Sequence, residues 1–190
     1  MELQGERLIP ASVDKTWASL NDPEVLKACI AGCETLERTG DDAMTAVVAL
    51  KVGPVSARFK GNLKLTNVQP PTGYTINFDG QGGVAGFGKG SADVALTPEG
   101  PGTRLRYNAR AQVGGKMAQV GSRLIDAAAG KITDDFFKAF EAHLQASAVP
   151  GEVATVPVAA VPDAGTAGMT RLWWLIGGVV LLAIVYFLIR

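Results

Sequence analysis

The chain has very little of the residues from which most metal and catalytic sites are built. Its 190 residues include one histidine, His143, and two cysteines, Cys29 and Cys33. A metal or redox site needs a second cysteine pair or several histidines, and a hydrolytic triad needs a histidine beside its nucleophile. We therefore expect no metal and no enzymatic activity. We interpret the cysteines as small packing residues, since a disulfide is disfavoured in the cytosol, and His143 as a solvated residue of a helix face.

A net charge is also lacking. The chain has 18 Lys and Arg residues against 18 Asp and Glu residues, and two of each lie beyond Ala146. Nothing in this balance points to nucleic-acid binding or to electrostatic membrane binding.

Residues 1–10 contain no apolar run long enough for a secretory signal. We therefore expect the N-terminal part to remain in the cytoplasm.

The longest apolar run lies at the C-terminus. Residues 172–189 have neither charge nor proline, with two tryptophans near one end and a tyrosine near the other. A helix of this length spans about 27 Å, close to the hydrocarbon core of a bilayer. We predict a transmembrane anchor at residues 171–190, joined by an Ala/Pro/Val-rich linker at 147–170. The protein would then be tail-anchored in the cytoplasmic membrane, with its soluble domain facing the cytoplasm.

The pattern of apolar residues changes along residues 1–146. A strand is predicted at residues 2–9, followed by two short helices that begin after Ser12 and Asp22, both good N-cap residues. From about residue 44 to 113, apolar and polar residues alternate, which is typical of antiparallel strands with one face on a core. We expect about six strands after the two helices.

The period then changes to three or four residues. Apolar residues from Met117 to about Gln145 follow helical spacing, and we predict one continuous helix of about 30 residues, weakened at Gly121 and Gly130. The fold class is therefore α+β, a curved antiparallel sheet around a long C-terminal helix. Such an architecture commonly leaves an apolar cavity between the helix and the sheet.

The glycine-rich segment Gly80–Gly90 resembles a phosphate-binding loop but differs from it in two ways. The residue after Lys89 is Gly90 rather than Ser or Thr, and the segment joins two strands rather than opening a helix. Two interpretations remain open. The segment is a flexible hairpin tip, or it is a mobile lid whose Val84 and Phe87 touch a ligand or a partner.

Aromatic rings and small residues share the inward faces of the predicted strands and helix. Either the rings fill the interior, or they leave a cavity in which an inward tyrosine hydroxyl meets a ligand carbonyl. The candidate ligand-binding residues are Phe59, Tyr74, Phe78, Val84, Phe87, Tyr107, Met117, Val120, Gly121, Leu124, Phe136 and Phe140.

Four blocks of the chain carry a family resemblance: DPEVLKACIAGCETLE, VGPVSARFKGNLKL, GQGGVAGFGKGSADV and AQVGGKMAQVGSRLIDAAAGKITDDFFKAF. They resemble the CoxG family of carbon monoxide dehydrogenase subunits, within the START-like, or SRPBCC, helix-grip superfamily. One small departure is Ala31, where proline is usual. The resemblance covers nearly all of residues 1–145.

The resemblance implies a helix-grip domain with an apolar cavity. It also implies an accessory protein, encoded with CO dehydrogenases of the molybdenum hydroxylase type, that recruits the dehydrogenase complex to the cytoplasmic membrane. A quinone in the cavity, menaquinone or ubiquinone, would accept the electrons.

Three hypotheses follow. The chain is a membrane-tethered quinone or lipid carrier, a docking adaptor with a packed interior, or an enzyme of the cyclase or hydratase type. The third would depend on Tyr74 and Tyr107 as its inward acid–base groups.

Overall fold

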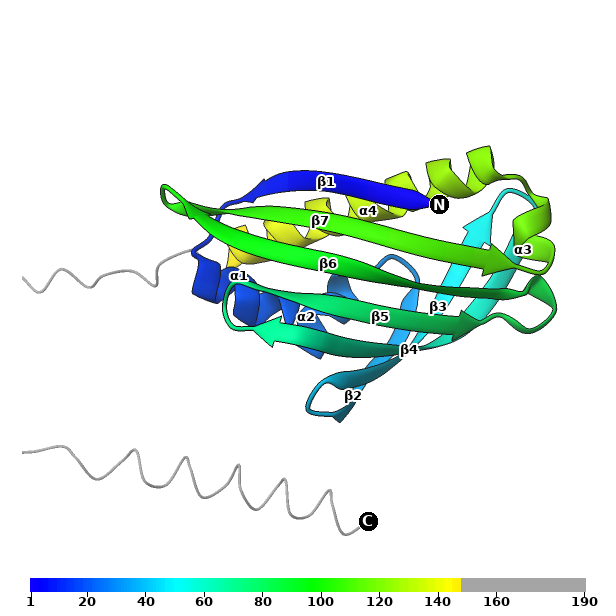
Figure 1. The fold of residues 1–190 in the computed structure, drawn as a ribbon, viewed down its shortest axis with the longest axis horizontal. Helices are drawn as coiled ribbons and strands as arrows, with labels where there is room; N and C mark the ends of the chain where they lie inside the picture. The colour runs from blue at the N-terminus through cyan, green and yellow to red at the C-terminus, as the bar shows by residue number, and fades with distance from the viewer. Residues whose placement is uncertain (148–190) are drawn as a thin grey trace, which may run out of the picture. The chain divides into compact units, whose positions relative to one another are not determined.

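A computed structural model describes residues 1–147, which form a seven-stranded antiparallel sheet with a long helix along one face (Figure 1). The strand order is β1-β7-β6-β5-β4-β3-β2. In chain order the elements are β1 (Glu2–Ile9), α1 (Val13–Leu20), α2 (Pro23–Cys29), β2 (Cys33–Gly40), β3 (Ala43–Val52), β4 (Val55–Gln69), β5 (Gly73–Gln81), the 3₁₀ turn η1 (Gly83–Ala85), β6 (Phe87–Glu99), β7 (Gly102–Gly114), α3 (Lys116–Gln119) and α4 (Ser122–Ala146).

The predicted membrane anchor lies outside the described residues, as does the predicted linker from residue 148 onward. Among the helices of residues 1–147, none combines the length and the hydropathy needed to cross a membrane.

The two short helices begin where their caps predict. The Ser12 hydroxyl accepts a hydrogen bond from the backbone N–H of Lys15 at 3.3 Å, and the Asp22 carboxylate accepts one from the N–H of Glu24 at 2.9 Å. Each cap satisfies a backbone donor that the first helical turn leaves free. In α2, Pro23 occupies the first turn, where a missing N–H costs nothing.

The alternation of apolar residues correctly predicts the faces of the sheet. Leu63 of β4, Phe78 of β5, Gly90 of β6 and Ala111 of β7 are register partners in one row, so they share one face. We call this the inner face, because the buried strand residues Leu96 and Leu105 belong to the same face and pack against α4.

The long C-terminal helix departs from the prediction. The helical spacing predicts one helix from Met117 to about Gln145, but the chain breaks at Gly121, with φ 93° and ψ 146°. That backbone conformation is open to glycine and strained for other residues. The break divides the segment into the one-turn helix α3 and the 25-residue helix α4, so the prediction of one continuous helix is wrong.

The larger of two hydrophobic clusters lies at one end of the domain, which we call the closed end; the smaller one joins Leu36 of β2 to Met44 and Ala46 of β3. The buried residues of the larger cluster are Ile9, Ala11, Leu20, Val25, Cys29, Leu96, Leu105, Phe137, Phe140 and Leu144. Helix α4 contributes only its C-terminal half, since none of residues 122–135 is buried. That first half reaches the β3–β4 hairpin, where a Cβ placed on Gly53 would lie 3.6 Å from the Leu124 side chain. We call this region the open end. It comprises residues 122–135 of α4 and the part of the inner face of β4–β7 that the closed-end core does not cover.

Two glycines of the C-terminal segment should respond oppositely to alanine. Nothing lies within 4 Å of a Cβ built on either Gly121 or Gly130, but only Gly121 has a positive φ. We expect Gly130→Ala to stabilise the fold by about 0.5–1 kcal/mol, since alanine is the better helix former, and Gly121→Ala to destabilise it by about 1 kcal/mol or more. Urea unfolding of both variants measures the difference. A gain of stability in both would mean that the break at Gly121 is absent in solution.

Candidate functional site

The inner face at the open end is the candidate ligand site, because apolar groups there are only half-buried. Phe59 and Phe78 are in this class, as are Ala109 and Ala111, and the opposing residues 122–135 of α4 are half-buried or exposed. Solvent therefore reaches apolar surface between the sheet and the first half of α4. An apolar surface left open in this way is where a ligand gains most from burial.

Rings from neighbouring strands cover several of the glycines on this face. A Cβ added to Gly90 would lie 2.7 Å from the Phe78 ring, and one on Gly82 would lie 2.6 Å from Phe59. On β1, a Cβ on Gly5 would lie 2.5 Å from the hydroxyl oxygen of its register partner Tyr107. The rings thus occupy part of the space that these small residues leave, so the inner face is filled more than its composition suggests.

The two inward tyrosines differ in their surroundings. Tyr74 is 5% exposed and packs edge-to-face on Trp17 of α1, with ring centroids 5.3 Å apart. Burial raises the pKa of Tyr74 well above its usual range. Tyr107 is half-buried and stacks on Phe137 of α4 at 5.5 Å. Among residues 1–147, neither hydroxyl makes a hydrogen bond to a side chain or backbone group, and Tyr107 is the more accessible of the two.

The other candidate residues divide between the core and the surface. Phe140 is fully buried at the closed end and Met117 is 5% exposed in α3, so both serve packing. Phe136 is half-buried and stacks on Phe140 at 5.7 Å. At the open end Leu124 is 48% exposed, while Val120 is half-buried and Gly121 exposed.

The glycine-rich connection between β5 and β6 is packed at its centre and apolar at its tip. Ala85 is buried at 4% exposure, whereas the adjacent Val84 is 84% exposed. The backbone of Gly86 lies against that of Gly115, where a Cβ would come within 2.5 Å of the Gly86 Cα. Phe87 pairs with Gly114 in register, on the face opposite to Gly90 and Ala111, and is 39% exposed. The strand register therefore separates Phe87 from the inner-face candidates.

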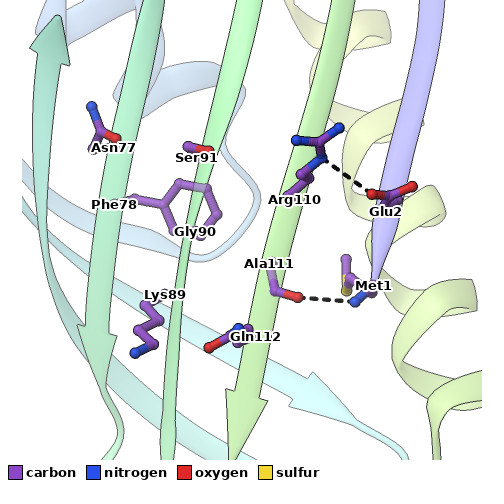
Figure 2. Close-up of a pocket in the computed structure, with 10 residues that line it drawn as sticks. All are labelled: Met1, Glu2, Asn77, Phe78, Lys89, Gly90, Ser91, Arg110, Ala111 and Gln112. Carbon is purple, nitrogen blue, oxygen red and sulfur yellow. Dashed lines mark hydrogen bonds and ion pairs between the residues drawn. The ribbon is translucent and has the colours of Figure 1, made fainter.

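A shallow hollow of about 680 Å³ crosses β5, β6, β7 and the start of β1. Figure 2 shows its lining, in which polar and apolar surface are nearly balanced: Met1, Glu2, Asn77, Phe78, Lys89, Gly90, Ser91, Arg110, Ala111 and Gln112. Arg110 pairs with Glu2 at 3.1 Å, and the N-terminal amine donates a hydrogen bond to the Ala111 carbonyl at 2.9 Å. Phe78 alone among the candidate ligand residues lines this hollow, and no motif in the sequence marks it.

The structure also shows a polar group on the inner face that the sequence analysis missed. Arg7 pairs with Asp134 of α4 and lies over the ring of Phe137. The sequence could have shown this, because side chains two residues apart in a strand share a face, so Arg7 lies on the same face of β1 as Gly5 and Ile9. An arginine among apolar residues on an inward face is unusual and marks the position for attention.

The cysteines are free thiols, one buried and one half-buried. Burial raises the pKa of both Cys29 and Cys33, which lowers the fraction present as reactive thiolate. Within residues 1–147, no three His, Cys, Asp or Glu side chains are grouped so as to hold a metal ion.

A curved antiparallel sheet gripped by a C-terminal helix, with an apolar inner face open at one end, defines a helix-grip domain of the START-like, or SRPBCC, class. Solved structures share this fold. A conserved protein from Geobacillus kaustophilus is 31% identical, with a TM-score of 0.73 over 77% of this chain and 97% of that one. TTHA0849 from Thermus thermophilus is 19% identical, with a TM-score of 0.59 over 78% and 99%. Ara h 8.0201 is 14% identical, with a TM-score of 0.54 over 77% and 98%.

The family model for CoxG, a subunit of carbon monoxide dehydrogenase, matches residues 5–145, and the chain belongs to this family. A search of the curated proteins found no match. The match spans the described domain from β1 to the last turn of α4, so the resemblance seen in the sequence is confirmed.

The buried Tyr74 should make stability fall at alkaline pH. The unfolded chain releases a tyrosine proton near pH 10, whereas the folded state holds that of Tyr74 to higher pH. The contribution of this shift is fully present below about pH 10 and is lost as the pH rises through the folded-state value. We expect the free energy of unfolding of the wild type to fall more steeply above pH 10 than that of Tyr74→Phe, as measured by urea titration at several pH values. Parallel profiles would contradict a buried Tyr74 hydroxyl.

Proposed function

We propose that this chain is a non-enzymatic accessory protein that recruits a molybdenum-containing CO dehydrogenase to the cytoplasmic membrane. In this proposal the inner face at the open end holds a quinone, menaquinone or ubiquinone, which passes electrons to the respiratory pool. The observation that carries the ligand proposal is the division of α4 into a buried C-terminal half and a first half without buried residues. The family supports the choice of partner, since it is described as a subunit of CO dehydrogenase.

The chemistry of the inner face suits a molecule with a long apolar tail and a small polar ring. Small residues such as Ala109 and Ala111 leave room above the sheet, and half-buried rings such as Phe78 offer apolar contact. Burial of each methylene group of a tail contributes about 0.8 kcal/mol, so a prenyl chain has ample driving force. The hydroxyl of Tyr107 supplies a polar group near the core.

The sequence supplies the membrane part of the proposal. Residues 171–190 would anchor the chain, and a linker of about 25 residues would give the domain a reach of roughly 25–30 Å. The domain would thus meet both the dehydrogenase and the membrane while remaining attached.

A second candidate function is a docking adaptor without a ligand. The rings of Phe59, Phe78 and Tyr107 lie over glycines, and this arrangement favours an interior that is already filled. A lipid carrier for another dehydrogenase would use the same open end as the quinone carrier, and the identity of the bound molecule distinguishes these two.

A bulky side chain at the open end should block ligand binding. Ala109 is half-buried on the inner face, and its neighbour Asn108 is exposed on the outer face. We expect Ala109→Trp to reduce the quinone bound to the full chain at least tenfold, because tryptophan fills the space above β7. The matched control Asn108→Trp should bind like the wild type. The measurement is native mass spectrometry with solvent extraction of protein purified from membranes.

The outcomes of this test separate the two candidate functions. Stoichiometric quinone in the wild type and its loss in Ala109→Trp alone would support the carrier. A wild type that binds the dehydrogenase but contains no quinone or lipid would leave only the docking adaptor.

The predicted anchor should be dispensable for ligand binding. We expect removal of residues 148–190 to leave quinone binding within about twofold of the full chain, because every candidate ligand residue lies before residue 148. The same removal should shift the dehydrogenase from the membrane fraction to the soluble fraction, as measured by sedimentation and immunoblotting. Continued membrane attachment of the truncated chain would contradict an anchor at residues 171–190.

A further inference from the structure

Arg7 is a positively charged residue on the apolar inner face, held by groups of α4. Its Nη2 forms an ion pair with Asp134, and its guanidinium carbon lies 5.5 Å from the centre of the Phe137 ring. The side chains of Arg7 and Asp134 are 38% and 56% exposed, so the ion pair lies at the rim of the inner face rather than inside it.

One donor of this guanidinium has no partner. Among the side chains of residues 1–147, Arg7 Nε is the only buried nitrogen or oxygen that lacks a hydrogen bond. The pairing with Asp134 uses Nη2 and leaves Nε free. A buried donor without an acceptor is unfavourable, and such a group in a native fold calls for a missing oxygen atom.

A second donor lies close to Arg7. Tyr107 stacks on Phe137, the ring over which Arg7 lies, and its hydroxyl approaches Gly5, two residues before Arg7 on the same face of β1. The Arg7 guanidinium and the Tyr107 hydroxyl lie at the boundary between the closed-end core and the open end, because Phe137 belongs to the core and Tyr107 packs against it. A polar site therefore adjoins the apolar surface that continues past Ala109.

We propose that Arg7 Nε is the hydrogen-bond donor to a carbonyl oxygen of the bound quinone ring, with the tail extending over Ala109 toward the open end. This inference rests on the proposed quinone-binding function and names the residue that recognises the polar ring. Asp134 acts as a positioning residue, because it holds the guanidinium so that Nε faces the ligand. A neutral carbonyl fits Nε because Asp134 already balances the charge of Arg7.

The test separates recognition of the ring from recognition of the tail. The full chain in detergent is titrated with ubiquinone-2, with menaquinone-2, and with a prenyl hydrocarbon of the same chain length that contains no oxygen. Arg7→Met keeps an apolar stem of similar length but removes every donor. Arg7→Lys keeps the charge opposite Asp134 but places no donor at Nε, and it serves if Arg7→Met does not fold.

We expect both variants to weaken binding of the quinone that the wild type prefers by about tenfold or more. Binding of the hydrocarbon should change less than about twofold, because its apolar contacts remain. The matched control is Arg106→Met, since Arg106 lies on the outer face and pairs with Glu6 at 3.3 Å. This control should bind all probes like the wild type. Infrared spectra should show a carbonyl stretch of the bound quinone at lower frequency in the wild type than in either Arg7 variant.

Each contrary result has a distinct meaning. Unchanged quinone affinity and an unchanged carbonyl frequency in both variants would overturn the role of Arg7 while leaving quinone binding intact. Equal loss of quinone and hydrocarbon would make Arg7 a structural residue and would also overturn it. A wild type that binds none of the probes would overturn the proposed function itself, and the inference with it.

Discussion

The packing of the C-terminal half of α4 against the sheet is the constraint on which the rest of the domain depends. Phe137, Phe140 and Leu144 are buried among residues of β1, β6, β7 and the two short helices. These contacts hold one end of a 25-residue helix and leave the other end to cross the sheet with little burial. The C-terminal half of α4 therefore stabilises the fold, while its first half leaves apolar surface accessible. Exposed apolar surface at the open end does not weaken the packing of the core.

Much of this architecture could be predicted from the sequence, because its local signals agree. The caps at Ser12 and Asp22 mark helix starts, and the alternation of apolar residues identifies the faces of β3 to β7. Strand β2 gave a weaker signal, since only Leu36 is buried among charged and polar neighbours. The break at Gly121 was also beyond prediction. Gly121 and Gly130 look alike in the sequence, and only the backbone conformation distinguishes them.

The candidate site could be predicted only in part, because it depends on strand register. Alternation placed Phe59, Phe78 and Tyr107 inward, but the contact of each ring with a glycine requires knowing which residues lie opposite one another. Phe87 illustrates the same limit, since the register of β6 places it on the face opposite to the other rings. Arg7 was not a candidate because a charged residue in a strand is usually solvated, and only the structure shows that this partly exposed side chain has partners on α4.

The two edge strands of the sheet, β1 and β2, each carry a feature that opposes pairing with a strand of another chain. An exposed edge strand presents unpaired backbone groups to which another strand adds readily, and inward charges and bulges oppose this addition. On β1 the inward charge is Arg7, and on β2 the register shifts after Cys33 and after Arg38. Each edge thus carries a local irregularity that interrupts strand addition. Loss of Arg7 would therefore remove an obstacle to strand addition along the β1 edge.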